Sequence, residues 1–373
     1  MIIKKTQQIL LYLSLVVFTL PVVAVDVIKS QAVDFKLETV AKGFGIPWGL
    51  VFLNPDQLLI TERDGGIKLL DVNTGRSVRI SGAPDVYARG QGGLLDVAIA
   101  KNYAQTGWIY FTYVKEQFGE GVTVLSRAKL RNTKLHDWQD LLITDSATDS
   151  TRHFGSRIAF DKDGYVYFTV GDRGDRPNGQ DLSNHAGTVM RLHPDGKVPD
   201  DNPFNNRNDA RNEIWSYGHR NPQGISYDPL HERLWLIEHG PRGGDEINLV
   251  VRGKNYGWPV ISYGKEYWGP LAVGEGTHRE GMEQPVKQYT PSIAPGSLLL
   301  YSGNAFKPWK GNLFSGALKL THLNRVVLSD DGKAIDEERL LGDLNERIRA
   351  LAEDSQGWIY FSTDSGKIYR MAP

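Results

Sequence analysis

His153 and Asp172 are the two residues whose types best suit acid–base chemistry. His153 precedes one short branched and aromatic run and Asp172 follows the next, so neighbouring strands would bring both residues to one end. An imidazole whose tautomer and orientation are fixed by a carboxylate is a common general base near neutral pH. The alternative is a structural brace between two loops, and the two residues alone leave both interpretations open.

A turn-rich loop further along the chain has the oxygen donors of a calcium site. It reads Gly240-Pro241-Arg242-Gly243-Gly244-Asp245-Glu246, and Asn255-Tyr256-Gly257-Trp258 follows shortly after it. Carboxylates and backbone carbonyls are the hard ligands that Ca²⁺ prefers. Because the spacing is not that of an EF-hand, the loop's composition indicates calcium without establishing it.

Three cationic side chains, Lys319, Arg347 and Arg349, come near the C-terminal end of the chain. The whole protein carries 43 Lys and Arg against 44 Asp and Glu, a formal charge of −1, so broad attraction to nucleic acid or anionic membrane is excluded. A local cationic cluster instead favours a small polyanionic ligand, with salt bridges to neighbouring segments as the alternative. No dinucleotide fingerprint or P-loop supports a nicotinamide or nucleotide cofactor.

The elements that must position these residues recur along the chain. A turn followed by a branched and aromatic run occurs six times, and the runs begin at residues 58, 109, 166, 234, 313 and 359. Another strand-like phrase precedes each run and a third follows most of them, as an antiparallel meander requires. Six such units predict an all-β fold, a six-bladed β-propeller of four-stranded antiparallel blades, rather than a β-sandwich pair or a β-helix.

The meander also sorts the loops between two faces. The loop that enters the first strand of a unit and the loop that joins its second and third strands lie at the same end, which we call the top face. We expect the ring to close when residues 35–40 supply the outer strand of the last blade. The polar residues assigned to the top face are Glu62, Arg63, Gln91, His153, Asp172, Arg173, Arg220, Asn221, residues 238–246, Lys319, Arg347, Arg349 and Asp364.

The N-terminal segment indicates export. Lys4 and Lys5 precede an apolar stretch and small residues, so residues 1–24 are predicted to be a signal peptide, with an uncleaved anchor helix as the alternative. We expect residues 25–373 to form one domain, because no linker divides them. The chain has no Cys, which excludes disulfides, Cys-type zinc sites and Cys nucleophiles.

Several ordered motifs together resemble the soluble aldose (glucose) dehydrogenases that use pyrroloquinoline quinone (PQQ). The resemblance covers roughly all of the chain after the signal peptide. The motifs lie at residues 90–96, 153–174, 217–224, 238–241, 245–248 and 255–259. This family folds as a six-bladed propeller, which agrees with the repeat count.

The resemblance implies a role for each candidate residue. His153 would take the C1 hydroxyl proton of a sugar while hydride passes from C1 to the quinone, and Asp172 would orient His153 and contact the sugar. Arg220 and Asn221 would hydrogen-bond the quinone oxygens. Backbone carbonyls of Gly240 and Pro241 would hold a Ca²⁺ on the cofactor, and a second, structural calcium would involve Asp245, Glu246 and Tyr256. The residues that would receive the cofactor carboxylates are Gln91, Lys319, Arg347 and Arg349.

The implied function is a periplasmic quinoprotein that oxidises aldose sugars to lactones and passes electrons to an unidentified acceptor. Its partners would be small sugars rather than nucleic acid, without stable membrane insertion after signal cleavage, in a monomer or a dimer. Two alternatives stay open: a calcium-dependent lactone hydrolase and a non-catalytic binding propeller. The cationic trio argues against the hydrolase, since a neutral lactone has no need of three positive charges.

Overall fold

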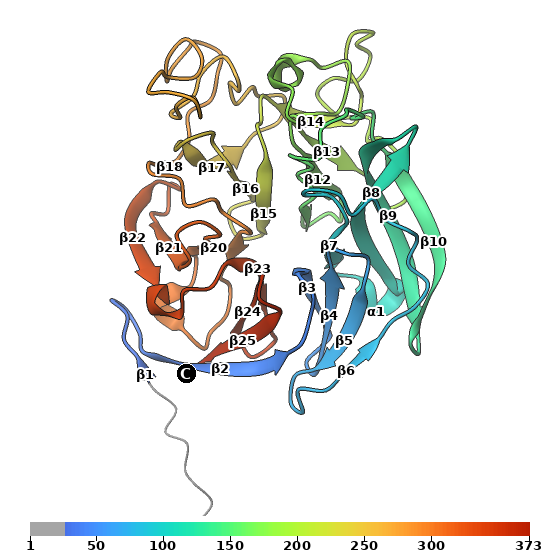
Figure 1. The fold of residues 1–373 in the computed structure, drawn as a ribbon, viewed down its shortest axis with the longest axis vertical. Coiled ribbons are helices and arrows are strands. Elements are labelled where there is room, and N and C mark those ends of the chain that lie inside the picture. Colours follow the sequence, from blue (N-terminus) through green and yellow to red (C-terminus); the bar gives the residue numbers. More distant parts are fainter. Residues whose placement is uncertain (1–26) are drawn as a thin grey trace, which may run out of the picture.

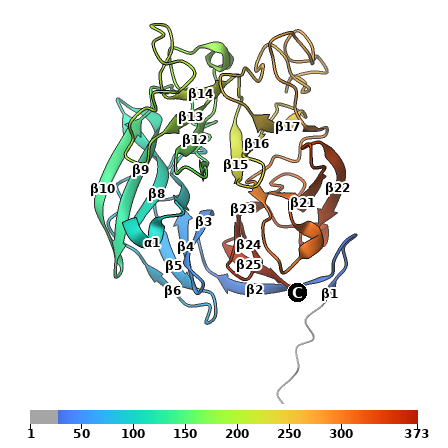
Figure 2. The ribbon, with the colours of Figure 1, turned by 180° about the vertical axis from the view of Figure 1, so that it is seen from behind.

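A computed structural model describes residues 27–373, and the predicted signal peptide lies outside these residues. Six antiparallel sheets surround a central axis like the blades of a propeller, and both axial views show the same ring (Figures 1 and 2). Helix is limited to α1 (Tyr103–Thr106) and three short 3₁₀ turns, η1 (Arg176–Gln180), η2 (Lys307–Trp309) and η3 (Gly342–Leu344). The predicted all-β, six-bladed propeller is therefore confirmed.

The first three blades follow the chain from the innermost strand outward. Blade 1 contains β3 (Pro47–Asn54), β4 (Gln57–Glu62), β5 (Ile67–Asp71) and β6 (Ser77–Arg79). Blade 2 contains β7 (Leu94–Ile99), β8 (Trp108–Gln117), β9 (Glu120–Arg131) and β10 (Lys134–Ile143). Blade 3 contains β11 (Ile158–Phe160), β12 (Val166–Val170), β13 (Thr188–Leu192) and β14 (Ile214–Tyr217).

The last three blades complete the ring. Blade 4 contains β15 (Pro222–Asp228), β16 (Arg233–Glu238), β17 (Asp245–Val250) and β18 (Lys287–Tyr289). Blade 5 contains β19 (Leu299–Leu300), β20 (Leu313–Gly316), β21 (Leu323–Leu328) and β22 (Ala334–Leu340). Blade 6 contains β23 (Ile348–Glu353), β24 (Ile359–Thr363) and β25 (Lys367–Ala372), with β2 (Phe35–Lys42) and then β1 (Val27–Ile28) outside them.

The ring closes by pairing the two ends of the described chain. Strand β2 runs antiparallel to β25, with Lys36 opposite Ala372 and Thr39 opposite Tyr369. The N-terminal strand thus becomes the outer strand of the last blade, as the sequence predicts (Figure 1). This pairing ties the first described residues to the last, so the blades form a continuous ring.

Neighbouring blades pack face to face, which explains the uninterrupted apolar runs in the sequence. Every residue of β12, β13 and β24 is buried, because the inner strands are covered on both faces. Outer strands are more exposed, and all three residues of β6 face solvent. The hydrophobic core is accordingly divided into clusters, such as Leu59, Val97 and Phe111 between blades 1 and 2.

A hydroxyl group on the second strand of four blades forms a hydrogen bond, here called a latch, to the next blade. Thr61 donates to the Leu95 carbonyl at 2.5 Å, Thr112 to Ser156 at 2.6 Å and Ser362 to Pro47 at 2.8 Å. Thr169 donates to the Pro222 carbonyl at 3.4 Å. Because each latch joins a strand to the first-strand region of the following blade, it holds the top loops of adjacent blades in register.

Arg157 lies where the blades meet at the axis and contacts all five other blades. Its Nε donates to the Gln223 carbonyl at 2.8 Å, and its Nη1 donates to Asp96 at 2.9 Å and to the Trp48 carbonyl at 3.2 Å. Its Nη2 donates to the carbonyls of Gly296 and Arg349. All five guanidinium donors are therefore used.

Candidate active site

The His153–Asp172 pair forms as the sequence predicts. His153 lies before β11 and Asp172 follows β12, and His153 Nδ1 is 2.6 Å from Asp172 Oδ1. The backbone N–H of His153 donates to Gln91 Oε1 at 2.8 Å. The contact to Asp172 makes Nδ1 the protonated nitrogen, which leaves Nε2 as the basic one.

Burial sets the charge state of this pair. It lowers the pKa of His153 more than the hydrogen bond that His153 donates to Asp172 raises it. Burial acts to raise the pKa of Asp172, but the contacts with His153 and the nearby Arg220 outweigh it, and that pKa lies below its ordinary value. At neutral pH the pair is therefore a neutral imidazole beside a carboxylate, the state in which His153 can accept a proton.

Trp258 is a further member of this cluster to which the sequence assigned no role. Its indole Nε1 donates to the other carboxylate oxygen of Asp172 at 2.8 Å. The guanidinium carbons of Arg220 and Arg176 lie 5.2 and 5.6 Å from its ring centroid. Trp258 belongs to the long connection between β17 and β18, which the meander rule assigns to the opposite face. This connection instead returns to the top face, where the hydrogen bond from Trp258 holds the Asp172 carboxylate in place.

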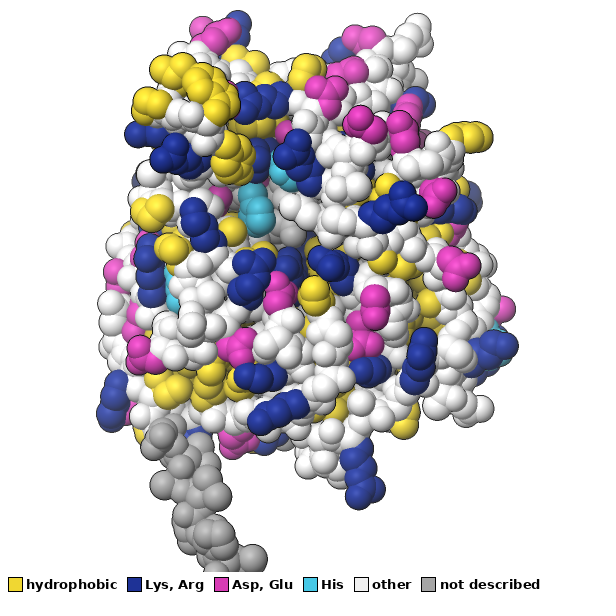
Figure 3. Space-filling model, in the orientation of Figure 1, with side chains coloured by type: hydrophobic (Ala, Val, Ile, Leu, Met, Phe, Trp, Pro, Cys, Tyr) yellow, Lys and Arg dark blue, Asp and Glu magenta, His cyan; other side chains and the backbone are white. Residues whose placement is uncertain are grey.

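A cavity of about 190 Å³ opens beside this cluster at the top of the axis. Its polar lining residues are Arg63, Gln91, Asn221, Gln223, His239, Arg347 and Arg349. Figure 3 shows Lys and Arg side chains gathered around the hollow at the centre of the face. The sequence places all of these polar lining residues except Gln223 on the top face, and the structure shows that they line one cavity.

The cations at this cavity are only partly neutralised by the protein. Arg347 Nε and Arg349 Nε contact the Asp364 carboxylate at 2.8 and 2.9 Å. Arg63 donates to the Gly90 carbonyl at 3.2 Å. Three guanidinium groups thus face one carboxylate, and the surplus positive charge suits an anionic ligand. Lys319, in contrast, is exposed, and its neighbour Leu318 lines the cavity in its place.

Arg220 and Asn221 connect the cationic cavity with the His153–Asp172 pair, since Asn221 lines the cavity and Arg220 contacts Asp172. Arg220 Nη1 donates to the Gly240 carbonyl at 2.9 Å, and its backbone carbonyl accepts from the Asp172 N–H at 2.8 Å. Asn221 Oδ1 accepts from Gln223 Nε2 at 3.2 Å, which turns the amide nitrogen away from that contact. Both side chains can therefore donate to a ligand that reaches from the cavity to His153.

The predicted calcium loop holds its carboxylates in two different environments. Asp245 is buried and accepts from the N–H of Gly240, the hydroxyl of Ser292 and the N–H of Ala294, each at 2.8–2.9 Å. Its oxygens therefore brace the loop. The Tyr256 hydroxyl is also engaged, since it donates to the Leu249 carbonyl at 2.6 Å.

Glu246 and Glu238 are the carboxylates that meet at a small cavity. This cavity of about 20 Å³ is also lined by Gly240, Tyr256 and Ser262. Burial and repulsion from Glu238 raise the pKa of Glu246 to about 8. The nearby Asn248 Oδ1 is buried without a hydrogen-bond partner among the described residues. Of the residues predicted for the structural calcium, Asp245 and the Tyr256 hydroxyl therefore have partners within the protein, whereas Glu246 meets Glu238, to which the sequence assigned no calcium role.

Within residues 27–373, no group of three or more His, Asp or Glu side chains has the geometry of a metal site. A cation here would consequently need backbone carbonyls beside the two carboxylates, a ligand mixture that Ca²⁺ accepts. The room of about one water molecule is enough for a single ion.

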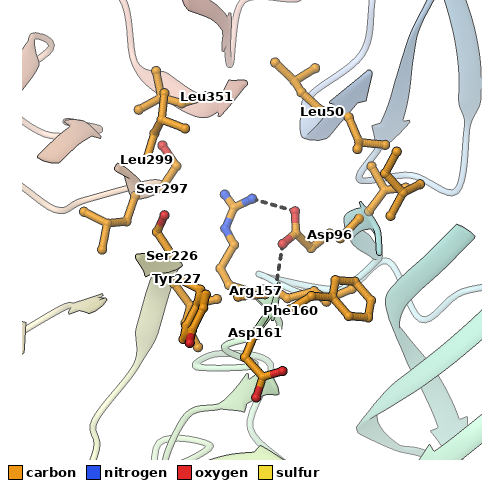
Figure 4. Close-up of a pocket in the computed structure, with 18 of the residues that line it drawn as sticks. Leu50, Asp96, Arg157, Phe160, Asp161, Ser226, Tyr227, Ser297, Leu299 and Leu351 are labelled. Atoms are coloured by element: carbon orange, nitrogen blue, oxygen red, sulfur yellow. Dashed lines mark hydrogen bonds and ion pairs between the residues drawn. The ribbon is translucent and has the colours of Figure 1, made fainter. Parts of the chain in front are cut away.

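A larger cavity of about 510 Å³ opens at the opposite end of the axis. Figure 4 shows Arg157 and Asp96 at its centre, surrounded by aliphatic side chains such as Leu50 and Leu351. Because the five donors of Arg157 are already satisfied, its polar floor offers little to a ligand. The smaller top cavity, with its surplus charge and its base, is the better candidate.

Comparison with known proteins agrees with this geometry. The sequence model of the family described as Glucose / Sorbosone dehydrogenase matches residues 44–370. The chain belongs to this family. The match spans all six blades of the ring, and it confirms the resemblance to soluble sugar dehydrogenases that the motifs indicate.

Several known sugar dehydrogenases are similar to this chain over most of their length. The aldose sugar dehydrogenase YliI of Escherichia coli is 40% identical over 338 residues, covering 88% of this chain and 90% of the relative. The apo-form structure of the E. coli aldose sugar dehydrogenase has a TM-score of 0.87 at 37% identity, covering 91% of this chain and 99% of the other. The PQQ-bound aldose sugar dehydrogenase from Streptomyces coelicolor has a TM-score of 0.74 at 26% identity, covering 91% and 98%.

Proposed function

We propose that this protein is a periplasmic quinoprotein that oxidises aldose sugars at C1 to lactones, with PQQ and Ca²⁺ as its cofactors. The observation that carries the proposal is the cationic top cavity directly beside the His153–Asp172 pair. The PQQ-bound relative and the predicted signal peptide support the cofactor and the location. Among residues 27–373, no helix has the length and apolar character needed to cross a membrane.

The residues of the cavity fit a cofactor with three carboxylates. Arg63, Arg347 and Arg349 would hold the carboxylates together with Gln91, while Arg220 and Asn221 would hydrogen-bond the quinone oxygens. Lys319 follows the lining residue Leu318 in the chain, and it would contact a cofactor carboxylate from the edge of the cavity. When bound, the quinone would supply a two-electron acceptor, and reoxidation would require a further acceptor.

The protein's own contribution to the reaction is to position the sugar and remove its proton. His153 Nε2 would accept the C1 hydroxyl proton, while Asp172 holds the imidazole in the required tautomer and balances the imidazolium charge. The donors of Arg220 and Asn221 would face the charge that develops on the acceptor oxygens. Removal of the hydroxyl proton and loss of hydride from C1 convert a cyclic aldose into its lactone.

The calcium proposal rests on oxygen donors in the loop after β16. The carbonyls of Gly240 and Pro241 would hold the ion at the cofactor, although Gly240 also accepts from Arg220. Glu246, Glu238 and the backbone carbonyl of Tyr256 would hold the structural ion. A divalent ion would neutralise two neighbouring carboxylates that otherwise repel each other.

The proposed function is tested by dye-linked oxidation assays on purified protein, with and without PQQ and Ca²⁺. A panel of aldoses and one lactone serves as substrates. We expect aldose oxidation only when both cofactors are present. If the lactone is hydrolysed instead, the protein is the alternative hydrolase; if PQQ neither binds nor supports turnover, a binding propeller is the better account.

Replacement of Glu246 by glutamine tests the structural calcium. We expect the variant to lose thermal stability relative to the parent protein in calcium but to differ little from it in chelator, because an ion stabilises the folded state that binds it. Thermal unfolding of both proteins with and without calcium measures this. An equal loss in both conditions would reject Glu246 as a ligand.

Replacement of Trp258 by phenylalanine tests the contact to Asp172. The change keeps an aromatic ring but removes the N–H that stabilises the carboxylate charge. Without this N–H, Asp172 interacts more strongly with the His153 imidazolium, so the pKa of His153 rises. The acidic limb of kcat/KM therefore moves to higher pH. We also expect a loss of about 10-fold in kcat, the order expected for a lost hydrogen bond to a charged group. An unshifted pH profile would assign Trp258 to packing alone.

A further inference from the structure

A short β-hairpin rises from the connection between β17 and β18. Within residues 264–273, the N–H of Glu266 donates to the Leu271 carbonyl at 2.8 Å and the N–H of Val273 donates to the Gly264 carbonyl at 3.1 Å. Lys265 is paired antiparallel with Ala272. The tip of the hairpin, which we call the aromatic tip, consists of Tyr267, Trp268, Gly269 and Pro270. Because its two arms are hydrogen-bonded, the aromatic tip has a defined conformation.

Large apolar side chains at this hairpin face solvent. Trp268 is 74% exposed, Tyr267 is 64% exposed and Leu271 is 57% exposed. Figure 3 shows hydrophobic side chains gathered over this connection, at the upper left of the same face as the central hollow. Single exposed apolar side chains are ordinary, but a group at one rigid site indicates a binding surface.

The aromatic tip is anchored to the segments that carry the catalytic pair. Glu266 forms two hydrogen bonds of 2.7 Å with the guanidinium of Arg176, which lies in η1 after Asp172. The Tyr267 hydroxyl accepts from Arg220 Nη2 at 3.4 Å. Gly269 accepts from Arg242 Nη1 at 3.2 Å. Contacts to three cations on different loops hold the tip at the rim of the site.

One layer of side chains separates the aromatic tip from the catalytic pair. Trp258 contacts Asp172 directly, and Arg176 and Arg220, which both lie within 5.6 Å of its ring centroid, contact the hairpin. A ring that rests on the tip is therefore displaced from a ring that reacts at His153 by about one such layer. A single sugar ring occupies one position or the other, whereas a linked pair of rings can occupy both.

We propose that Tyr267 and Trp268 form a subsite for the second pyranose ring of an oligosaccharide whose reducing-end ring is oxidised at His153; this inference rests on the proposed function. Aromatic faces bind the C–H face of a pyranose, and the hydroxyls at the ring edge need donors and acceptors. The Arg176–Glu266 ion pair, beside the aromatic tip, supplies hydrogen-bond donors and acceptors for these hydroxyls. A folded protein partner is disfavoured, because a stable interface buries about 800 Å² per partner and one hairpin tip is far smaller.

The kinetic test compares glucose with maltose, using the cofactor-loaded protein and its Trp268→Ala variant. We expect the KM for maltose to rise about 10-fold, the order of one lost stacking contact, and the KM for glucose to change less than about 2-fold. Trp268→Phe should recover part of the maltose affinity. Leu230→Ala is the matched control, because Leu230 is 81% exposed in the turn between β15 and β16 at the opposite face.

A second measurement does not depend on turnover. Methyl α-maltoside has no free anomeric hydroxyl and cannot be oxidised at C1, so its binding to the cofactor-free protein is followed by tryptophan fluorescence. We expect a saturable change that is lost in Trp268→Phe. If the parent protein oxidises neither glucose nor maltose but still shows the fluorescence change with methyl α-maltoside, the proposed function is wrong and the subsite is supported.

The opposite outcomes overturn the subsite while leaving the dehydrogenase intact. Equal changes in the KM for glucose and maltose would assign Trp268 to general loop structure. An unchanged maltose KM, with fluorescence insensitive to the glycoside, would exclude ring binding at the tip. A defect confined to the concentration dependence of the oxidising dye would make the tip an acceptor contact instead.

Discussion

Replacing His153 with alanine is expected to lower sugar turnover by about 100-fold or more while the protein still binds PQQ. In the proposed reaction His153 accepts the C1 hydroxyl proton, because its Nδ1 is held by Asp172 at 2.6 Å and its Nε2 is left as the base. The proposed cofactor contacts come from other residues, chiefly the cations around the top cavity. Steady-state kinetics and a separate cofactor titration measure the two effects.

The pH dependence of the parent enzyme gives a second check on His153. Burial lowers the pKa of His153 below its ordinary value of 6.5, so the neutral, basic form persists to lower pH than in a free imidazole. We therefore expect the acidic limb of kcat/KM to lie below pH 6.5. His136→Ala, on the outer strand β10, is the control and should leave the rate and the limb unchanged. Near-normal turnover in the His153 variant would remove this residue from the mechanism.

Replacing Arg157 with leucine is expected to lower the free energy of unfolding by about 3–5 kcal/mol. The change leaves the buried Asp96 carboxylate without its cation and deprives four backbone carbonyls of a donor. Burial already raises the pKa of Asp96, and loss of the Arg157 charge would raise it further. Because the folded state then binds a proton more readily than the unfolded state, the loss should shrink as pH falls.

Chemical denaturation at several pH values separates this charge effect from a simple packing defect. A packing defect alone would give a loss that does not depend on pH. Arg207→Leu is the control, since Arg207 pairs with Asp209 on the exposed surface, and its removal should change stability little. An Arg157 variant as stable as this control would show that the axial contacts do not hold the blades together.

The ring architecture was predictable because both faces of the inner strands are buried. Burial on both faces produced the apolar runs at residues 58, 109, 166, 234, 313 and 359, and the meander rule then placed His153 and Asp172 at one end. The rule works where a connection is short. It fails for the connection between β17 and β18, whose length lets Trp258 return to the top face. Periodicity carries no information about the path of such an insertion.

Side-chain partners were harder to predict than positions. Asp245 and Glu246 are adjacent in the sequence, yet alternation along β17 directs Asp245 to Ser292 and Glu246 to the side of Glu238. The top-face loops brought Arg63 near Arg349, but only the structure shows that both line one cavity.

The hydroxyl latches did leave a signal in the sequence. Thr61, Thr112, Thr169 and Ser362 each occupy the fourth position of the recurring run, as in Ile109-Tyr110-Phe111-Thr112. A hydroxyl within an otherwise apolar repeat indicates a buried hydrogen bond, because such a group is rarely left without a partner.

The position of Arg157 also affects how ligands reach the candidate site. Because its side chain bonds to all five other blades, it separates the top cavity from the larger cavity at the other end of the axis, so within residues 27–373 the candidate site opens at the top face alone. In the proposed reaction, sugar and oxidant would then enter by that opening in turn, and the lactone would leave before the oxidant enters. Such an order gives parallel lines in double-reciprocal plots, and it makes excess sugar a competitor of the oxidant.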